Sequence, residues 1–416
     1  MTLQRTASQA EGLAHRFRQV RARSLALCAG LTAEDMMVQS MPDASPAKWH
    51  LAHTTWFFEQ FVLGRDPAYR PRHSEWHYLF NSYYQTVGPM HARPQRGLLS
   101  RPSLEEVLGY RQHVEAAVQE RLTDDIEPAL AGIVELGLQH EQQHQELLLT
   151  DIKHALSLSP LRPAYDASMV AAEPGSPVPL AFFAGREGIA DIGHAGDGFA
   201  FDNEGPRHRT WLQPHLLANR LVTNAEYRMF VQDGGYREPL LWLSDGWATV
   251  QTEGWQRPLY WQEDLSSEFT LGGVQAVDPA APVAHLSYYE ADAFARWAGA
   301  RLPTEAEWES AAESLPVRGN LLDERPQHPR AAAGEGLLQM YGDVWEWTAS
   351  PYVSYPGFQP LPGALGEYNG KFMCGPWVLR GGSCATPRDH IRASYRNFFP
   401  PQARWQFAGL RLARNR

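Results

Sequence analysis

The sequence predicts a two-domain protein in which an N-terminal bundle of α-helices precedes a C-terminal α+β domain with much irregular structure. The chain has 416 residues, which is more than one ordinary core holds. Apolar residues recur at helical spacing from about residue 10 to 158. Beyond about residue 180 the chain is rich in Gly, Trp and Asn, with short apolar segments between turns. We expect a bundle over 1–160, a linker over 161–180 and a second domain over 181–416.

The predicted bundle contains segments with the pattern of amphipathic helices. They span residues 11–31, 45–64, 103–122 and 129–157. Ser103 and Glu106 have the spacing of a capping box, and Ser45 as N-cap with Pro46 at the first helical position is typical of a helix start. In the C-terminal part, helical patterns stand out over 287–300 and 304–313. Helix bundles often hold metal sites in their interior.

Charge and cysteine content exclude several classes of protein. The net charge of −10 disfavours a nucleic-acid partner, which needs clustered Lys and Arg. Three cysteines without CxxC spacing argue against a disulfide framework. The first residues lack the apolar core of a signal peptide, and no stretch is apolar enough to span a membrane. We expect a cytoplasmic protein without a membrane partner.

The most informative segment is His140-Glu141-Gln142-Gln143-His144 on the last predicted helix of the bundle. Residues four apart lie on one helix face, so both imidazoles can reach one metal ion. The spacing matches the zincin HExxH pattern, although a solvated or hydrogen-bonded pair has the same spacing. His50 and His53 offer a further imidazole on an aromatic helix. Three neutral imidazoles would leave coordination positions open, and they suit Zn, Fe or Cu.

These residues, in this order, resemble the ergothioneine-biosynthesis sulfoxide synthases and their relative selenoneine synthase. The matching motifs cover nearly the whole chain and include PAKWHLAHTTWFFEQFVL, LFNSYYQTVG, RPQRGLLSRP, HEQQHQELLLTDIKH, FAFDNEGPRHR, GDVWEWTASPY, EYNGKFM and LRGGSCATP. The resemblance implies a DinB-like four-helix bundle, which carries an iron site. It also implies a second domain of the formylglycine-generating-enzyme fold, which is related to C-type lectins and contributes a substrate pocket.

The resemblance also implies a ligand set and a reaction. Fe(II) would be held by His53, His140 and His144, and Gln143 would bond the imidazole of hercynine, the trimethylated betaine of histidine. The enzyme would use O2 to join the sulfur of a thiol donor to C2 of that imidazole and would leave a sulfoxide. Hercynine and the donor are the expected small-molecule partners.

Further site residues follow from the same motifs. Tyr83 and Tyr84 are candidate proton donors, with loop packing as the other interpretation. Arg93 and Arg96 are candidate anchors for the co-substrate carboxylate, or structural arginines. The remaining candidates bind hercynine, whose cation suits aromatic faces, although core packing also explains each aromatic ring. They are Tyr355, Asn397, Phe398 and Phe399.

Two departures from the family pattern leave the donor open. Phe399 stands where the branch that uses γ-glutamylcysteine has an acidic residue, which disfavours that dipeptide. Gly375-Pro376 replaces an Asn-Gln pair, which removes hydrogen-bonding groups and stiffens the loop. A selenosugar donor, as in selenoneine synthase, is therefore the alternative to a thiol.

Three other activities compete with the oxygenase interpretation. A formylglycine-generating enzyme needs a pair of cysteines near the C-terminus, and Cys384 has no partner beyond it in the sequence. A DinB-type metal-dependent thiol transferase would leave the second domain without a role. A carbohydrate-binding module would leave the histidines without one. Oxygen consumption with hercynine and a donor distinguishes these activities.

Overall fold

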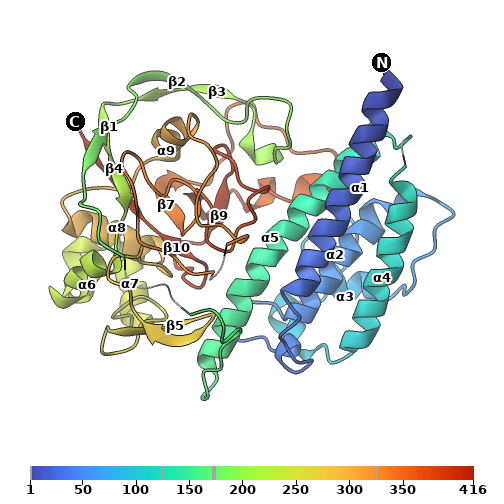
Figure 1. Cartoon of the computed structure of the whole chain (residues 1–416), viewed down its shortest axis with the longest axis horizontal. Helices are drawn as coiled ribbons and strands as arrows, with labels where there is room; N and C mark the ends of the chain where they lie inside the picture. Colours follow the sequence, from blue (N-terminus) through green and yellow to red (C-terminus); the bar gives the residue numbers. More distant parts are fainter. Residues whose placement is uncertain (1, 124, 171–174, 325–326) are drawn as a thin grey trace. The chain divides into compact units, whose positions relative to one another are not determined.

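The structure, a computed structural model, describes residues 2–123, 125–170, 175–324 and 327–416. The chain divides into two compact units, Met1–Ser159 with Pro362–Tyr368, and Pro160–Leu361 with Asn369–Arg416. The first unit is helical and the second is α+β (Figure 1), which confirms the predicted fold class. Residues 171–174 of the expected linker lie outside the described part of the chain. Among the described residues, no helix has both the length and the apolar character needed to cross a bilayer.

The helical unit is built around one buried helix. Its helices are α1 (Thr2–Ala26), α2 (Ala47–Phe61), α3 (Trp76–Phe80), α4 (Leu104–Arg121) and α5 (Pro128–Leu158). Helix α2 packs against α4 and α5, and α1 packs against α5 (Figure 1). Every residue of α2 from Ala47 to Glu59 is buried. A helix buried on all sides lies at the centre of a bundle, so its polar side chains need partners within the protein.

Helix α5 approaches α2 closely because position 137 is a glycine. A Cβ atom added to Gly137 would lie 2.6 Å from Cε1 of Phe58 on α2 and 3.0 Å from Cε1 of Phe57. Such distances are too short for carbon atoms, so a side chain at this position would displace the Phe57 and Phe58 rings. Gly137 lies about one helical turn before His140, so these rings pack against α5 next to a candidate ligand.

The helix starts agree with the sequence in one case and differ in the other. The predicted capping box is confirmed: Ser103 accepts from the backbone of Glu106, and the Glu106 side chain accepts from Ser103 N–H. The expected start of α2 is wrong by one residue, because Pro46 takes the N-cap position and the helix begins at Ala47. The hydroxyl of Ser45 instead accepts from Nη1 of Arg96 at 2.9 Å.

The second unit combines short helices with small sheets. Its helices are α6 (Asn224–Gln232), α7 (Ser244–Glu253), α8 (Tyr288–Trp297) and α9 (Glu305–Ala312). Its strands are β1 (Phe182–Ala184), β2 (Gly188–Ile192), β3 (His208–Leu212), β4 (His215–Leu221), β5 (Ser267–Thr270), β6 (Gly273–Ala276), β7 (Trp345–Pro351), β8 (Trp377–Arg380), β9 (Asn397–Phe399), β10 (Ala408–Gly409) and β11 (Arg411–Asn415). The sheets have the orders β1-β4-β11, β10-β7-β8-β9, β2-β3 and β5-β6. Only the β10–β7 pair among these ladders is parallel.

Capping boxes mark α6, α8 and α9 of this unit. Helices α8 and α9 begin after Ser287 and Thr304, and both helices were expected from the sequence. Helix α6 was not expected, although Thr223 and Glu226 form the same type of cap. Helix α7 was also not expected, and no side-chain cap bond marks its start.

Candidate metal centre and substrate residues

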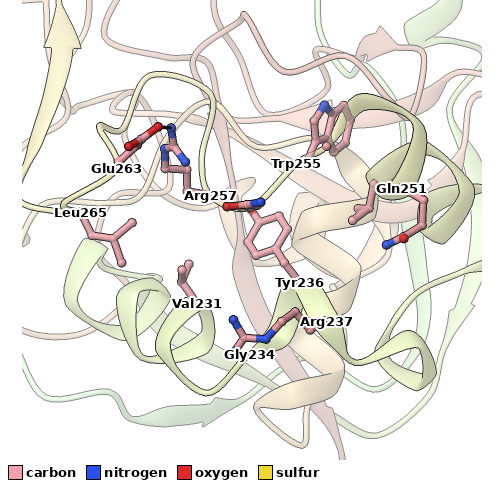
Figure 2. A pocket seen from close by; sticks show the side chains of 12 residues that line it. Val231, Gly234, Tyr236, Arg237, Gln251, Trp255, Arg257, Glu263 and Leu265 are labelled. Atoms are coloured by element: carbon pink, nitrogen blue, oxygen red, sulfur yellow. Dashed lines mark ion pairs between the residues drawn. The ribbon is translucent and has the colours of Figure 1, made fainter.

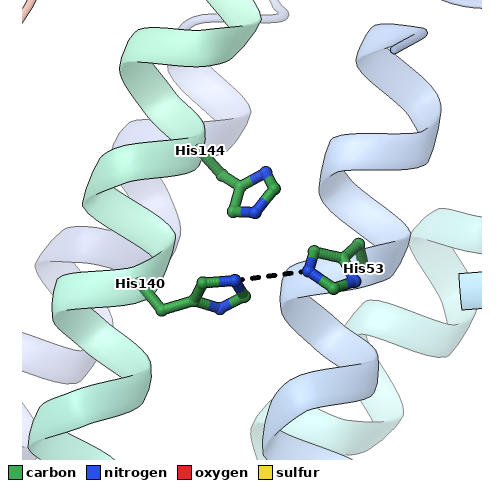
Figure 3. A group of neighbouring side chains, drawn as sticks. All are labelled: His53, His140 and His144. Carbon is green, nitrogen blue, oxygen red and sulfur yellow. Dashed lines mark hydrogen bonds between the residues drawn. The ribbon is translucent and has the colours of Figure 1, made fainter. Parts of the chain in front are cut away.

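Three histidines meet inside the helical unit. His53 extends from α2, and His140 and His144 extend from α5 toward it (Figure 3). One ring nitrogen from each lies within 4.8 Å of the other two. The Nε2 atoms of His53 and His140 are 3.2 Å apart. The structure thus brings together the three residues that the sequence singled out, at a spacing that one metal ion could bridge.

The three imidazole rings of this cluster are uncharged at neutral pH, as metal ligands must be. Burial lowers the pKa of His140 to about 3, and it holds the pKa values of His53 and His144 well below the usual range. Neutral imidazole is the form that binds a metal. Nδ1 of His53 donates to the Phe80 carbonyl at 2.6 Å, which leaves the Nε2 lone pair free to face the cluster. Nδ1 of His140 is buried without a hydrogen-bond partner in the described structure. The residues therefore fit a metal ion.

His50, the other histidine on α2, lies beside the cluster. Its Nδ1 is 2.8 Å from Nδ1 of His144, and its Nε2 is 3.1 Å from Oδ2 of Asp151. It is not one of the three residues whose nitrogens converge. His50 therefore contacts the candidate ligand His144 through its Nδ1 atom and is not itself a candidate ligand.

Glu141 does not take the position of a zincin base. Its carboxylate accepts hydrogen bonds from Nη1 of Arg21 at 2.9 Å, Nη2 of Arg111 at 2.7 Å and Oγ of Ser24 at 2.6 Å. Burial raises the pKa of Glu141, but the two guanidinium groups outweigh burial and lower the pKa to about 2. A carboxylate so engaged cannot accept a proton near neutral pH. Its role is to hold α1 and α4 against α5.

A tyrosine from the second half of the sequence lies beside the histidines. Tyr368 closes the Pro362–Tyr368 segment of the helical unit, and its ring centroid is 5.5 Å from that of His140. Glu367 anchors this segment because its carboxylate accepts from the backbone N–H groups of Gln85 and Thr86 at 3.0 and 2.9 Å. The motif EYNGKFM is visible in the sequence, but only tertiary packing brings Tyr368 to the site.

Tyr83 and Tyr84 occupy different surroundings. The ring of Tyr83 is 5.7 Å from that of Tyr368, which in turn contacts His140. Tyr84 is completely buried, with its ring 5.7 Å from that of Trp56. Desolvation raises the pKa of both phenols above the usual value, so both stay protonated at neutral pH. Each tyrosine is separated from the histidines by one ring: Tyr83 by Tyr368, and Tyr84 by Trp56, whose ring centroid lies 5.6 Å from that of His53.

The two candidate arginines differ in burial. Arg93 is exposed and donates to the backbone carbonyl of Asp43. Arg96 is buried with its guanidinium carbon 3.4 Å from the centroid of Trp49, and it donates to the hydroxyls of Ser45 and Ser82. Burial lowers the pKa of Arg96 to about 9. Among the described residues, no carboxylate forms an ion pair with it. Gln143 is half-buried on α5 beside His144.

Comparison with known proteins identifies the family. The DinB superfamily matches residues 16–148, and the sulfatase-modifying factor enzyme 1-like domain matches residues 186–321 and 325–416. Hercynine oxygenase of Mycolicibacterium thermoresistibile is 34% identical over 89% of this chain and 88% of its own. That of Mycobacterium tuberculosis is 34% identical over 97% of this chain and 98% of its own. The chain belongs to the hercynine oxygenase family. As a family member it is an oxidoreductase enzyme.

The similarity to formylglycine-generating enzymes covers only part of this hercynine oxygenase family member. The enzyme of Streptomyces coelicolor is 30% identical over 45% of this chain and 73% of its own. In the second unit, Cys374 is exposed and Cys384 is buried. Both are free cysteines, and the match of the sulfatase-modifying factor domain covers only the second part of the chain.

The other candidate residues lie in the second unit of this hercynine oxygenase family member, some on an accessible strand and one in a buried network. Asn397, Phe398 and Phe399 form β9, are all partly exposed, and pair with β8. The ring of Phe398 stacks on Tyr352 at a centroid distance of 4.0 Å. An accessible aromatic strand suits a ligand with a quaternary ammonium group.

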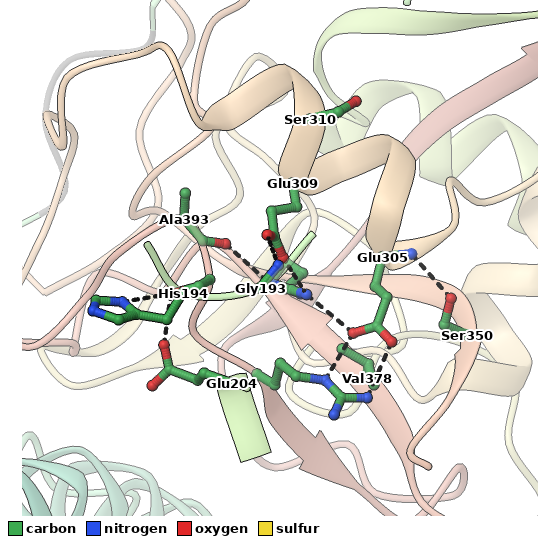
Figure 4. A network of polar contacts seen from close by, with 12 residues as sticks. Gly193, His194, Glu204, Glu305, Glu309, Ser310, Ser350, Val378 and Ala393 are labelled. Atoms are coloured by element: carbon green, nitrogen blue, oxygen red, sulfur yellow. Dashed lines mark hydrogen bonds and ion pairs between the residues drawn. The ribbon is translucent and has the colours of Figure 1, made fainter. Parts of the chain in front are cut away.

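Tyr355 instead belongs to a buried ionic network. Nη2 of Arg380 donates to Tyr355 at 3.0 Å, and the guanidinium of Arg396 lies 4.0 Å from the Tyr355 ring centroid. The same two arginines bind Glu305, and Figure 4 shows Glu305 within a network of polar contacts. The face of Tyr355 therefore already carries a cation, which favours the core-packing interpretation for this residue.

A surface depression in the same unit is made of other residues. It encloses about 390 Å³ and is lined by residues that include Tyr236, Arg237, Trp255, Arg257 and Glu263 (Figure 2). None of the candidate residues from the sequence lines it. We assign it no role in the reaction.

Proposed function

We propose that this chain is a non-haem Fe(II), O2-dependent enzyme that joins the sulfur of a thiol donor to C2 of the hercynine imidazole. The observation that carries the proposal is the convergence of His53, His140 and His144, whose ligand atoms lie within 4.8 Å of one another. An all-imidazole set suits Zn, Fe or Cu, and oxygenase chemistry needs a redox-active ion. Relatives named hercynine oxygenase support hercynine as the substrate.

The proposed reaction balances without a further reductant. The C2–H bond of hercynine and the S–H bond of the donor break, and a C–S bond forms. One oxygen atom of O2 becomes the sulfoxide oxygen and the other leaves as water with the two released hydrogens. Bound Fe(II) would supply the redox chemistry that activates O2.

The protein groups around the cluster have proposed roles in binding. Gln143 would hydrogen-bond the hercynine imidazole, and Arg96 would bind the carboxylate of the donor. Arg96 suits this role because its hydrogen-bond partners are neutral hydroxyls and its buried Nε has no partner in the described structure. A buried guanidinium without a bonded carboxylate is stabilised by an incoming anion. Asn397, Phe398 and Phe399 would bind the betaine end of hercynine.

The proposal is tested with Fe(II)-loaded protein in an oxygen electrode. Hercynine is supplied with cysteine, γ-glutamylcysteine and a selenosugar in competition, and the products are identified by mass. We expect O2 uptake only when hercynine and a donor are both present, and a sulfoxide product. Donor transfer without O2 uptake would indicate a DinB-type thiol transferase instead. A product with a C–Se bond alone would keep the iron chemistry and replace the thiol by the selenosugar of the alternative activity.

Tyr83→Phe is expected to shift products from hercynine coupling toward simple oxidation of the donor, because a proton donor near the cluster is lost. Tyr84→Phe should produce a smaller shift, since the Tyr84 side chain is completely buried whereas that of Tyr83 is partly exposed. The measurement is the ratio of coupled product to oxidised donor, by mass spectrometry.

Tyr110→Phe is the matched control, because its buried hydroxyl donates to Glu59 at 2.6 Å, away from the histidines. The control should leave the product ratio at the wild-type value. Unchanged ratios in both the Tyr83 and Tyr84 variants would remove these tyrosines from the reaction.

A further inference from the structure

Two buried polar side chains, Asp151 and His50, form a line of hydrogen bonds that ends at His144 of the histidine cluster. Oδ2 of Asp151 is 3.1 Å from Nε2 of His50, and Nδ1 of His50 is 2.8 Å from Nδ1 of His144. His50 is 3% exposed and Asp151 5%, so their hydrogen bonds are made inside the protein. His50 lies three residues before His53 on α2, and Asp151 lies seven residues after His144 on α5. The first spacing places His50 on the same face of α2 as His53, and the second places Asp151 on the same face of α5 as His144.

The donors and acceptors along this line can be assigned in order. An ionised carboxylate only accepts, and Oδ2 of Asp151 also accepts from Ser45 N–H at 2.8 Å. Nε2 of His50 must therefore carry a proton, and in a neutral imidazole Nδ1 is then an acceptor. With His50 taken as neutral, Nδ1 of His144 donates to it, which leaves the lone pair of His144 on Nε2. In Figure 3 the ring of His144 is directed toward His140 and His53.

We propose that Asp151 and His50 are positioning residues that fix the Nδ1–H tautomer of His144 and so present its Nε2 to the metal ion. This inference rests on the proposed metal site. It gives His144 the same arrangement that the Phe80 carbonyl gives His53, in which a donating Nδ1–H leaves Nε2 free. The reverse order of donors along the line would place a proton on Nε2 of His144 and block coordination there.

The test is a titration of metal-free protein with Co(II), followed by its visible d–d bands, which report ligand number and geometry. His50→Phe keeps a ring but offers no acceptor, and it is expected to weaken Co(II) binding about 10- to 100-fold and to change the bands. His50→Gln can accept from His144 and donate to Asp151, so it should restore affinity and bands. His50→Met matches Gln in length without a strong acceptor and should behave like His50→Phe.

We call the hydrogen-bonded line of Asp151, His50 and His144 the relay. The possible results distinguish a failure of the relay from a failure of the metal site. Wild-type affinity and bands in both His50→Phe and His50→Met would overturn the relay and leave the histidine cluster as the metal site. Equal weakening in His50→Gln and His50→Met would also overturn it, because packing would then explain the loss. Wild-type protein that binds no Co(II) would overturn the metal site and the relay together. If His50→Phe does not fold, as judged by circular dichroism, the difference in Co(II) affinity between His50→Gln and His50→Met decides whether the relay exists.

Discussion

His140→Ala is expected to abolish metal binding and turnover together. The variant removes one of three converging imidazoles and leaves two ligand atoms in a buried space. Because loss of a supporting hydrogen bond alone weakens a metal site about 10- to 100-fold, loss of a ligand should exceed about a hundredfold. The measurements are Fe(II) content after anaerobic loading, Co(II) affinity, and O2 uptake with hercynine and donor.

His154→Ala is the matched control for this experiment. His154 lies on the same helix, is partly buried, and bonds Ser40 through Nδ1 at 2.7 Å. Its removal should leave metal content and turnover unchanged, because its ring is not part of the cluster. Full activity in His140→Ala would refute the ligand assignment. Equal losses in both variants would indicate general damage to α5 rather than loss of a ligand.

Glu141→Ala is expected to lower the free energy of unfolding of the helical unit by about 3 kcal/mol, because two buried guanidinium groups lose one of the two carboxylates that they share. The other is Glu115, 2.8 Å from Nε of Arg21 and 3.0 Å from Nε of Arg111, and its presence places the loss at the lower end of the range for a broken buried ion pair. Arg21 is 2% exposed, Arg111 1% and Glu141 0%, so water does not replace the lost partner. Urea unfolding followed by circular dichroism measures the effect. Glu135→Ala is the control, since its ion pair with Arg16 is partly exposed and should contribute less than about 1 kcal/mol. A loss in Glu141→Ala no larger than in the control would contradict this role.

The Glu141 cluster also predicts how stability depends on pH. The pKa of Glu141 is lowered in the folded protein from 4.5 to about 2. Its contribution is therefore fully present above about pH 4.5 and is lost as the pH falls toward 2. Linkage converts this shift into about 3 kcal/mol. The difference in unfolding free energy between wild type and Glu141→Gln should shrink as the pH falls through this window. A difference that stays constant with pH would show that the carboxylate charge is not involved.

Much of the site could be predicted from the sequence because it depends on local spacing. The four-residue step from His140 to His144 puts both rings on one face of any α-helix. The spacing of Ser103 and Glu106 likewise defines a cap within one turn. His53 was singled out over His50 by resemblance rather than by spacing, since both lie on the same helix face.

Tertiary structure decided the properties that depend on long-range partners. The sequence by itself determined the fold class, and it predicted the histidines that could bind a metal, with His50 and His53 left as alternatives until the resemblance was used. Only packing showed that Glu141 faces Arg21 and Arg111, that His50 bonds both Asp151 and His144, and that Tyr368 lies beside His140. These partners lie on different elements, in the case of Tyr368 and His140 more than two hundred residues apart. Helical periodicity specifies which face a side chain occupies, whereas the identity of its partner depends on which other elements cover that face.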